Sequence, residues 1–191
     1  MSVQHSPTDD TLVAGIAAGD RAALSALFRR RQGDVFRFAL HLTGSRLVAE
    51  DVTQEVFLAV MRDAARYDPS RSSVVAWLCG IARNHARQRF DRDRPLVSLD
   101  DEDRREVATD RADTLGDLTR AEGIEAVRKA VVSLPMPYRE AVVLCDLQEL
   151  SYTDAAAALD CPTGTVRSRL HRGRAMLAAK LAGITNARWI A

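Results

Sequence analysis

The spacing of apolar residues restricts the fold of this chain more than any other feature of its sequence. Between Asp20 and Gly44 apolar side chains recur three and four residues apart, and the run stops at a glycine, which commonly ends helices. A second run ends at Asp68–Pro69, where proline disfavours further helix. The alternation typical of strands is nearly absent, and aromatic residues make up only 5% of the chain. The sequence therefore predicts an all-α fold.

The helical pattern falls into two blocks, which predicts two small helical domains. The first domain is expected to cover residues 1–91. Its stretch 20–44 is predicted to form two helices with a break near residues 32–34. Further helices are predicted at 50–66 and 73–90.

The stretch 92–122 separates the two blocks and is predicted to be a flexible linker. It holds Pro95, an acidic cluster at 100–103 and little sustained periodicity. About thirty residues would be unusual for a loop inside one compact domain. The second domain, residues 123–191, is predicted to contain helices at 123–132, 137–148, 152–159 and 163–181.

The distribution of charge is more informative than its total. The chain carries 27 Lys and Arg against 26 Asp and Glu. The predicted linker holds 6 basic and 10 acidic residues, whereas residues 123–191 hold 9 and 6, with no acid beyond Asp160. A basic end on a nearly neutral protein is a common electrostatic footprint for phosphate backbones. Nucleic-acid binding is therefore the first function to consider.

Residues 151–174 have the outline of a helix-turn-helix. The sequence SYTD at 151–154 is a capping-box pattern, in which Ser151 accepts a hydrogen bond from the first turn and Asp154 reaches back. A short turn with Pro162 and Gly164 follows, and then a helix rich in arginine. In this motif the second helix enters the major groove of DNA.

A helical wheel separates the arginine-rich helix into an apolar stripe and a polar face. The stripe consists of Val166, Leu170, Gly173 and Leu177. The opposite side holds Arg167, Ser168, His171 and Arg172, with Arg169 and Arg174 flanking it. Guanidinium groups and hydroxyls presented in this way suit guanine edges and phosphates. An isolated helix of this kind is more often a solvated surface, but the preceding capped helix and turn favour DNA binding.

The helix at 50–66 has two apolar sides. Val52, Val56, Ala59 and Val60 form one stripe, while Leu58 and Met61 lie on the far side beside Gln54, with Asp51 and Glu55 at the edge. Either both sides are buried within the domain, or the second side is a surface for a partner. Spacing alone favours burial of both sides.

The helix at 73–90 carries a second group of cations. Its end holds Arg83, Arg87, Arg89, Arg92 and Arg94 together with Asn84, His85 and Gln88. The amides could read bases, and the polar loop at 67–73 could line a pocket for an unstacked base. Trp77 could stack on a base, although an aromatic residue followed by apolar residues at helical spacing is more often part of a core.

No catalytic or metal-binding pattern is recognisable in the sequence. It lacks G-x-S-x-G, a phosphate-binding Gly-rich loop and H-E-x-x-H, its four histidines are scattered, and its three cysteines lack C-x-x-C spacing. We therefore expect no enzyme activity, no metal and no cofactor. No apolar run reaches roughly 18 residues and the N-terminus is polar, so we expect no membrane insertion and a cytoplasmic location.

The order of the motifs resembles a known family. The stretches AEDVTQEVFLAV, WLCGIARNHARQRF and GTVRSRLHRGRAML are similar to bacterial RNA polymerase sigma factors of the extracytoplasmic-function class, which belongs to the sigma-70 family. The similarity covers about residues 10–181. Three positions depart from the family pattern. Asp154 and Ala155 stand where Glu and an aliphatic residue are commoner, and Gly173 replaces a commoner Ala, at a cost of up to about 1 kcal/mol to the helix.

The resemblance implies a sigma region 2-like helical bundle and a sigma region 4-like helix-turn-helix domain. In the first domain, contacts to the clamp helices of the largest polymerase subunit fall on Asp51, Gln54, Glu55, Phe57 and Leu58. Contacts to the minus-ten promoter element fall on Asn84, Arg87, Gln88 and Arg92, with residues 67–73 as the pocket for a flipped base. Contacts to the minus thirty-five element fall on Thr165, Arg167, Ser168, His171, Arg172 and Arg174.

The function implied by the resemblance is promoter-specific initiation of transcription without catalysis. The implied partners are core RNA polymerase, including the flap of its second largest subunit, and promoter DNA; the family commonly also uses anti-sigma factors. Two other interpretations remain. A stand-alone helix-turn-helix repressor would bind its operator tightly without polymerase. A pure interaction protein would bind polymerase without contacting DNA, and the two basic segments argue against it.

Overall fold

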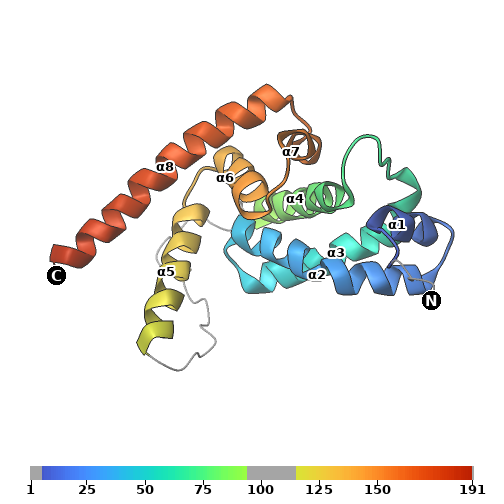
Figure 1. Ribbon diagram of the computed structural model, residues 1–191, viewed down its shortest axis with the longest axis horizontal. Coiled ribbons are helices and arrows are strands. Elements are labelled where there is room, and N and C mark those ends of the chain that lie inside the picture. The colour runs from blue at the N-terminus through green and yellow to red at the C-terminus, as the bar shows by residue number, and fades with distance from the viewer. Residues whose placement is uncertain (1–5, 94–114, 191) are drawn as a thin grey trace, which may run out of the picture.

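The computed structural model describes residues 6–93 and 115–190, and all regular elements in these ranges are helical (Figure 1). The all-α prediction is confirmed. The N-terminal group of helices consists of α1 (Asp9–Ala17), α2 (Arg21–Thr43), α3 (Arg46–Asp63), the short 3-10 helix η1 (Ala64–Arg66) and α4 (Val74–Asp93).

The N-terminal group is a bundle built around α2. This helix packs against α1, α3 and α4, and its Leu27, Phe38 and Leu42 are completely buried. Asp20 begins α2 by accepting hydrogen bonds from the backbone N–H groups of its first turn. Gly44 ends it with a φ of +73°, a conformation that favours glycine.

The predicted break near residues 32–34 is wrong, because α2 runs without interruption. Asp34 pairs with Arg31 and with Arg37, each three residues away, so ion pairs bridge the expected break on the helix surface. Val35 and Phe38 continue the buried stripe across it. Helix α1 was not predicted as a separate helix, and its Leu12, Val13 and Ile16 are buried.

The C-terminal group confirms the helix-turn-helix and extends two predicted helices. Its elements are α5 (Leu115–Val132), α6 (Met136–Val142), the π-helical segment η3 (Val143–Leu147), α7 (Tyr152–Leu159) and α8 (Thr163–Ile190). Because α4 reaches Asp93 and α5 begins at Leu115, helix occupies both ends of the predicted linker. The rest of that linker, residues 94–114, lies outside the described residues.

The predicted capping box at α7 is confirmed in one of its two halves. Ser151 Oγ accepts a hydrogen bond from the Asp154 backbone N–H at 3.0 Å. Instead of reaching back to the Ser151 backbone, the Asp154 carboxylate accepts from the Ser151 hydroxyl at 2.9 Å and from the Ser73 backbone N–H at 2.8 Å. The shorter acid therefore links α7 to the start of α4.

The two groups of helices pack directly against each other, with α6 and α7 above α4 (Figure 1). Buried residues of both groups belong to one hydrophobic core cluster. At the crossing of α4 and α7, a Cβ placed on Gly80 would lie 3.5 Å from the Ala158 carbonyl oxygen, so the two backbones approach closely. Arg139 of α6 donates to the Leu42 carbonyl at 2.6 Å, at the end of α2.

Candidate nucleic-acid interface

Helix α8 packs on the rest of the C-terminal group through the apolar stripe that the helical wheel predicted. Val166, Leu170 and Gly173 are buried and Leu177 is half-buried. A Cβ on Gly173 would lie 2.7 Å from Val142 Cγ2 in α6 and 3.1 Å from a backbone carbonyl of the same helix. Glycine at this position therefore allows α8 to approach α6 closely, which gives a packing reason for the departure from the family pattern.

The predicted minus thirty-five residues lie on the outer side of α8. Arg167, Ser168, His171 and Arg172 are exposed, whereas Thr165 is half-buried. The Thr165 carbonyl accepts a hydrogen bond from the Ser168 hydroxyl at 3.0 Å. The exposed set therefore combines two guanidinium groups, an imidazole and a hydroxyl on one face.

Two arginines of α8 are engaged by neighbouring side chains. The Arg167 guanidinium lies over the Tyr152 ring, 5.4 Å from its centroid, which holds it by a cation–π contact. Arg174 donates to both carboxylate oxygens of Asp146, from Nε at 3.0 Å and from Nη2 at 2.5 Å. These bonds and the charge of Asp146 raise the pKa of Arg174. Arg174 is thus the member of the predicted set whose guanidinium already has a bidentate partner.

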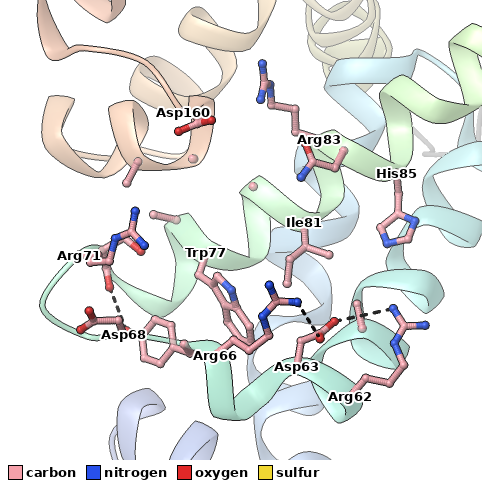
Figure 2. Close-up of a pocket in the computed structure, with 18 residues that line it drawn as sticks. Arg62, Asp63, Arg66, Asp68, Arg71, Trp77, Ile81, Arg83, His85 and Asp160 are labelled. Carbon is pink, nitrogen blue, oxygen red and sulfur yellow. Dashed lines mark hydrogen bonds and ion pairs between the residues drawn. The ribbon is translucent and has the colours of Figure 1, made fainter.

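A cleft of about 990 Å³ lies between the two groups of helices (Figure 2). The end of α3, η1, the loop at 67–72 and α4 form one side, and α7 with Asp160 lies across from them. Four arginines line it, namely Arg62, Arg66, Arg71 and Arg83. Three aspartates, Asp63, Asp68 and Asp160, line it as well, and Asp63 pairs with Arg62 and Arg66. Tyr67 and Trp77 also line it, with ring centroids 5.1 Å apart. Cations beside paired aromatic rings suit an unpaired nucleotide strand.

The predicted minus-ten residues extend from this cleft along α4. Asn84, Arg87, Gln88 and Arg92 are exposed, and Asn84 is the one among them that lines the cleft. Arg62, Arg66 and Arg71 also line the cleft, although they were not among the predicted site residues. Their position just before and within the polar loop was the available signal, because the loop had been predicted to form a base pocket.

Glu140 of α6 binds the arginines of α4 from the other group of helices. Its carboxylate is 1% exposed and accepts from Arg83 Nε at 2.8 Å, and Arg87 Nε lies 3.8 Å away. Arg83 itself is only 9% exposed. A buried pair of this kind keeps both charges satisfied out of water. An acid of the C-terminal group therefore occupies a position where a phosphate could meet these arginines.

The second apolar side of α3 is exposed, so the alternative that both sides are buried, which spacing alone favoured, is wrong, and the other alternative, an exposed second side, holds. Leu58 is 51% exposed and Gln54 and Glu55 are also exposed, while the stripe that contains Val52 and Val56 is buried. Leu47, 70% exposed, extends the same face. The spacing of apolar and polar side chains along this face could have identified Leu47, because positions three and four apart share one side of a helix.

The other two predicted polymerase contacts have partners within the chain. Asp51 accepts from Arg89 Nη2 at 2.7 Å, which joins α3 to α4 at a half-exposed site. Phe57 is 6% exposed and packs edge-on against Phe28, with ring centroids 4.8 Å apart. In this structure Phe57 is therefore a core side chain that supports the exposed face from beneath.

The described residues offer no arrangement suited to metal chemistry or to a membrane span. Within residues 6–93 and 115–190, no three His, Cys, Asp or Glu side chains gather as metal ligands. Across the same ranges, no helix has the length and apolar character that a bilayer span requires. The three cysteines are free thiols, and burial raises the pKa of Cys79 to about 12, which makes it unreactive.

This geometry defines a helical protein with a helix-turn-helix in its C-terminal group and exposed arginines on both groups of helices. Two family models match the chain, "Sigma-70 region 2" over residues 27–95 and "Sigma-70, region 4" over residues 124–177. An extracytoplasmic-function RNA polymerase sigma factor, SigE of Mycolicibacterium smegmatis, is 36% identical over 92% of this chain and 70% of its own length. SigC of Mycobacterium tuberculosis is 36% identical over 90% of this chain and 92% of its own.

Two solved structures share the fold. CnrH, in complex with the cytosolic domain of CnrY, has a TM-score of 0.67 and 26% identity, over 92% of this chain and 97% of CnrH. The sigma factor RpoE of Bartonella quintana, in complex with the anti-sigma factor NepR, has a TM-score of 0.67 and 27% identity, over 83% of this chain and 96% of RpoE. The chain belongs to the sigma-70 family of RNA polymerase sigma factors, in its extracytoplasmic-function class.

Proposed function

We propose that this sigma factor binds core RNA polymerase and directs it to promoters by contacts to two DNA elements. The exposed face of α8 reads the minus thirty-five element, with Arg167 and Arg172 as its cations. The arginine-lined cleft and the end of α4 bind the minus-ten element after it opens. The observation that carries this proposal is the presence of two separate basic surfaces, of which one lines a cleft with the paired rings of Tyr67 and Trp77. The protein then acts in the cytoplasm, as a binding subunit without chemistry of its own.

Run-off transcription with purified core polymerase tests the proposal. A DNA library randomised across both promoter elements replaces a known promoter, and the transcripts are sequenced. We expect specific start sites only when the chain is added. A chain that shifts DNA tightly alone but starts no transcript would be a repressor, and a chain that binds polymerase without changing the start sites would be an interaction protein.

The exposed face of α3 is proposed to contact the clamp helices of the largest polymerase subunit. Leu47, Leu58 and Met61 give this face apolar area, and Gln54 and Glu55 give it polar and acidic groups. Such a mixed surface fits a partner helix. Asp51 belongs to the same surface, although it shares its carboxylate with Arg89.

Reversing the charge of Glu55 tests the α3 contact. Glu55→Arg is expected to weaken core binding about tenfold or more, because like charges then face each other at the interface. Fluorescence anisotropy of labelled protein titrated with core polymerase measures the affinity. Arg46→Glu on the same helix serves as the control, since Arg46 pairs with Glu50 at the surface. Equal affinities for Glu55→Arg and the unaltered chain would remove this face from the proposal.

Binding to polymerase is proposed to separate the two groups of helices. In the structure the two groups are packed together, an arrangement that we call closed. Here Glu140 forms an ion pair with Arg83, and Ala157 and Ala158 of α7 line the side of the cleft opposite α4. A nucleotide strand and Glu140 would compete for the same cations. The closed chain is therefore expected to bind minus-ten DNA poorly until polymerase holds the two groups apart.

An anti-sigma factor is a further proposed partner. In two structures of similar fold the protein is bound to a partner: CnrH to the cytosolic domain of CnrY, and the sigma factor RpoE to the anti-sigma factor NepR. The exposed apolar side chains of α3 are candidates for such a contact, because a protein that covers them would exclude polymerase.

A further inference from the structure

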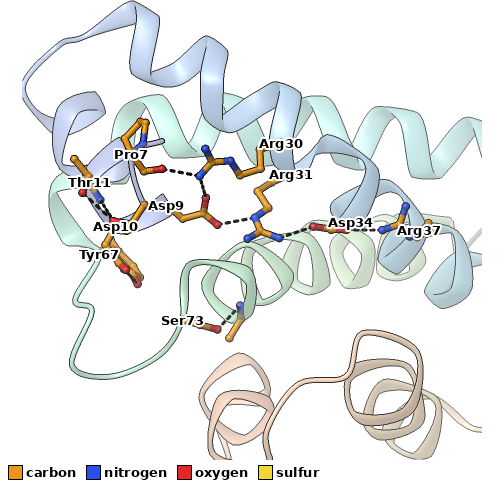
Figure 3. Close-up of polar contacts among 12 residues, drawn as sticks. Pro7, Asp9, Asp10, Thr11, Arg30, Arg31, Asp34, Arg37, Tyr67 and Ser73 are labelled. Atoms are coloured by element: carbon orange, nitrogen blue, oxygen red, sulfur yellow. Dashed lines mark hydrogen bonds and ion pairs between the residues drawn. The ribbon is translucent and has the colours of Figure 1, made fainter. Parts of the chain in front are cut away.

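Helix α1 supports the cleft although it lies outside both matched family regions. The regions cover residues 27–95 and 124–177, whereas α1 ends at Ala17. The hydroxyl of Tyr67 nevertheless donates to Asp10 Oδ1 at 2.6 Å, and Tyr67 lines the cleft. Figure 3 shows the two residues side by side, with Asp10 on α1 and Tyr67 just after η1.

Ion pairs hold α1 in a fixed position on α2 (Figure 3). Asp9, whose side chain is 11% exposed, accepts from Arg30 Nη1 at 2.8 Å and from Arg31 Nε at 2.6 Å. Arg30 also donates to the Pro7 carbonyl at 2.9 Å. With the buried apolar side of α1, these bonds fix the first turn of the helix. Asp10, the next residue, is therefore an acceptor with a defined position.

The hydroxyl of Tyr67 has two acceptors for one proton. Besides Asp10, the Ser72 carbonyl lies 3.0 Å away, so the hydroxyl spans the loop from its first part to its end. The contact to Asp10 is shorter and charge-assisted, which makes it the stronger of the two. Burial and the hydrogen bond to Asp10 raise the pKa of Tyr67, so the hydroxyl keeps its proton at physiological pH. The Tyr67 ring is thereby held against Trp77.

We propose that Asp10 is a positioning residue for the capture of an unpaired minus-ten base in the cleft. It acts through Tyr67, whose ring and loop form the wall that such a base would contact. This inference rests on the proposed function. It gives α1 a part in promoter recognition, because α1 supplies the charged and closer of the two acceptors that hold the Tyr67 hydroxyl, while the Ser72 carbonyl of the loop supplies the other.

The test compares promoter preferences of holoenzymes that contain full-length variants. Asp10→Ala and Tyr67→Phe remove the hydrogen bond from its two sides, and Asp10→Asn keeps an acceptor. Thr11→Ala is the matched control in the same turn of α1, since the Thr11 hydroxyl forms a hydrogen bond with Thr8, at 2.8 Å, and not with Tyr67. Each holoenzyme transcribes the library randomised over both elements, and core binding and thermal unfolding are measured for each variant.

We expect Asp10→Ala and Tyr67→Phe to reduce the base preference at one minus-ten position by roughly tenfold, because stacking and an ordered wall each contribute to holding a base. Preferences at the minus thirty-five element, and core affinity, should not change. Asp10→Asn should retain most of the preference, and Thr11→Ala all of it.

Two results for the variants would overturn the inference. One is an unchanged minus-ten preference in Asp10→Ala and Tyr67→Phe. The other is an equal loss of transcription on all sequences together with weaker core binding or earlier unfolding, which would mark a structural role only. A library in which the unaltered chain itself selects no sequence overturns the proposed function and this inference with it, and that result appears before any variant is compared.

Discussion

The arginines of α4 and those of α8 are the same residue type in different states. On α8, Arg167 and Arg172 are exposed on the outer face of a helix that its apolar stripe fixes in place. On α4, Arg83 is buried against Glu140, and Arg87 lies 3.8 Å from the same carboxylate. The difference comes from packing and not from composition. One basic surface is exposed, and the other is partly occupied by the chain itself.

The largest effect on stability is expected from removing Glu140, the acid that pairs with the buried arginine of α4. Glu140→Ala would leave the Arg83 guanidinium buried without its partner, so we expect the free energy of unfolding to fall by about 3 kcal/mol or more. Urea unfolding followed by circular dichroism measures it. Glu50→Ala removes an exposed partner of Arg46 and should cost less than about 1 kcal/mol.

A second variant separates the pair from the packing around it. Replacing Arg83 with Met and Glu140 with Leu together should recover most of the stability that Glu140→Ala loses, because neither charge is then buried alone. A loss below about 1 kcal/mol for Glu140→Ala would mean that Arg83 finds water when the acid is removed, and the α4 surface would then be less occupied than the structure indicates.

Substitutions on the exposed face of α8 should change DNA affinity and leave the free energy of unfolding unchanged. Arg172→Ala is expected to weaken holoenzyme binding to a minus thirty-five duplex by about 1 to 3 kcal/mol if Arg172 contacts a base, with relaxed preference at that base. An equal loss on all sequences would indicate a phosphate contact. Arg174→Ala is the internal comparison, because Asp146 already holds that guanidinium. A larger loss of DNA affinity from Arg174→Ala than from Arg172→Ala would contradict the proposal that Arg172, and not Arg174, is the main DNA contact of the two.

The seating of α8 gives a smaller effect whose sign is informative. Gly173→Ala should destabilise the fold by about 1 kcal/mol, because overpacking against Val142 and the α6 backbone exceeds the gain in helix propensity. Gly164→Ala in the same helix has open space around its Cβ and should stabilise by up to about 1 kcal/mol. Thermal and urea unfolding of both variants provide the comparison. Stabilisation by both would show that α8 can shift on α6 without strain.

The smallest effect concerns pH at the contact between α2 and α5. Burial lowers the pKa of His41, and the charges of Arg128 and Arg37 lower it further. The unfolded chain therefore binds the proton more readily, so this stability is present above about pH 6.5 and is lost as the pH falls toward the folded pKa. The drop in unfolding free energy from pH 7 to pH 5 should be smaller in His41→Gln. An identical drop in both proteins would remove His41 as its source.

Local patterns in the sequence predicted much of the fold but not its contacts. The stripe of α8 and the two sides of α3 followed from helical spacing, because burial has the same period as the helix. The break in α2 was predicted wrongly at a stretch where ion pairs of Asp34 bridge the helix surface. That correction needs side-chain partners, which spacing alone does not supply.

For the candidate sites too, the exposure of a side chain could be predicted from the sequence more readily than its partners. Exposure of Arg167 and Arg172 could be predicted from position on a helix, whereas spacing alone favoured burial of Leu58, which is exposed. The partners of Arg83 and Tyr67 could not, because Glu140 and Asp10 each lie 57 residues away in the sequence. These long-range contacts form only after the helices pack, and no local sequence motif predicts them.

The close crossing of α4 and α7 at Gly80 and Ala158 bears on how fast the closed form can open. Small residues at a crossing leave few long side chains that must change rotamer before two helices part, and they bury little apolar area that must be rehydrated. Besides the shared hydrophobic core, polar links such as the Arg83 pair and the contact of Asp154 to the Ser73 backbone hold the two groups together. A competing anion or a partner protein can replace these polar contacts one at a time. The two groups of helices can therefore separate in steps.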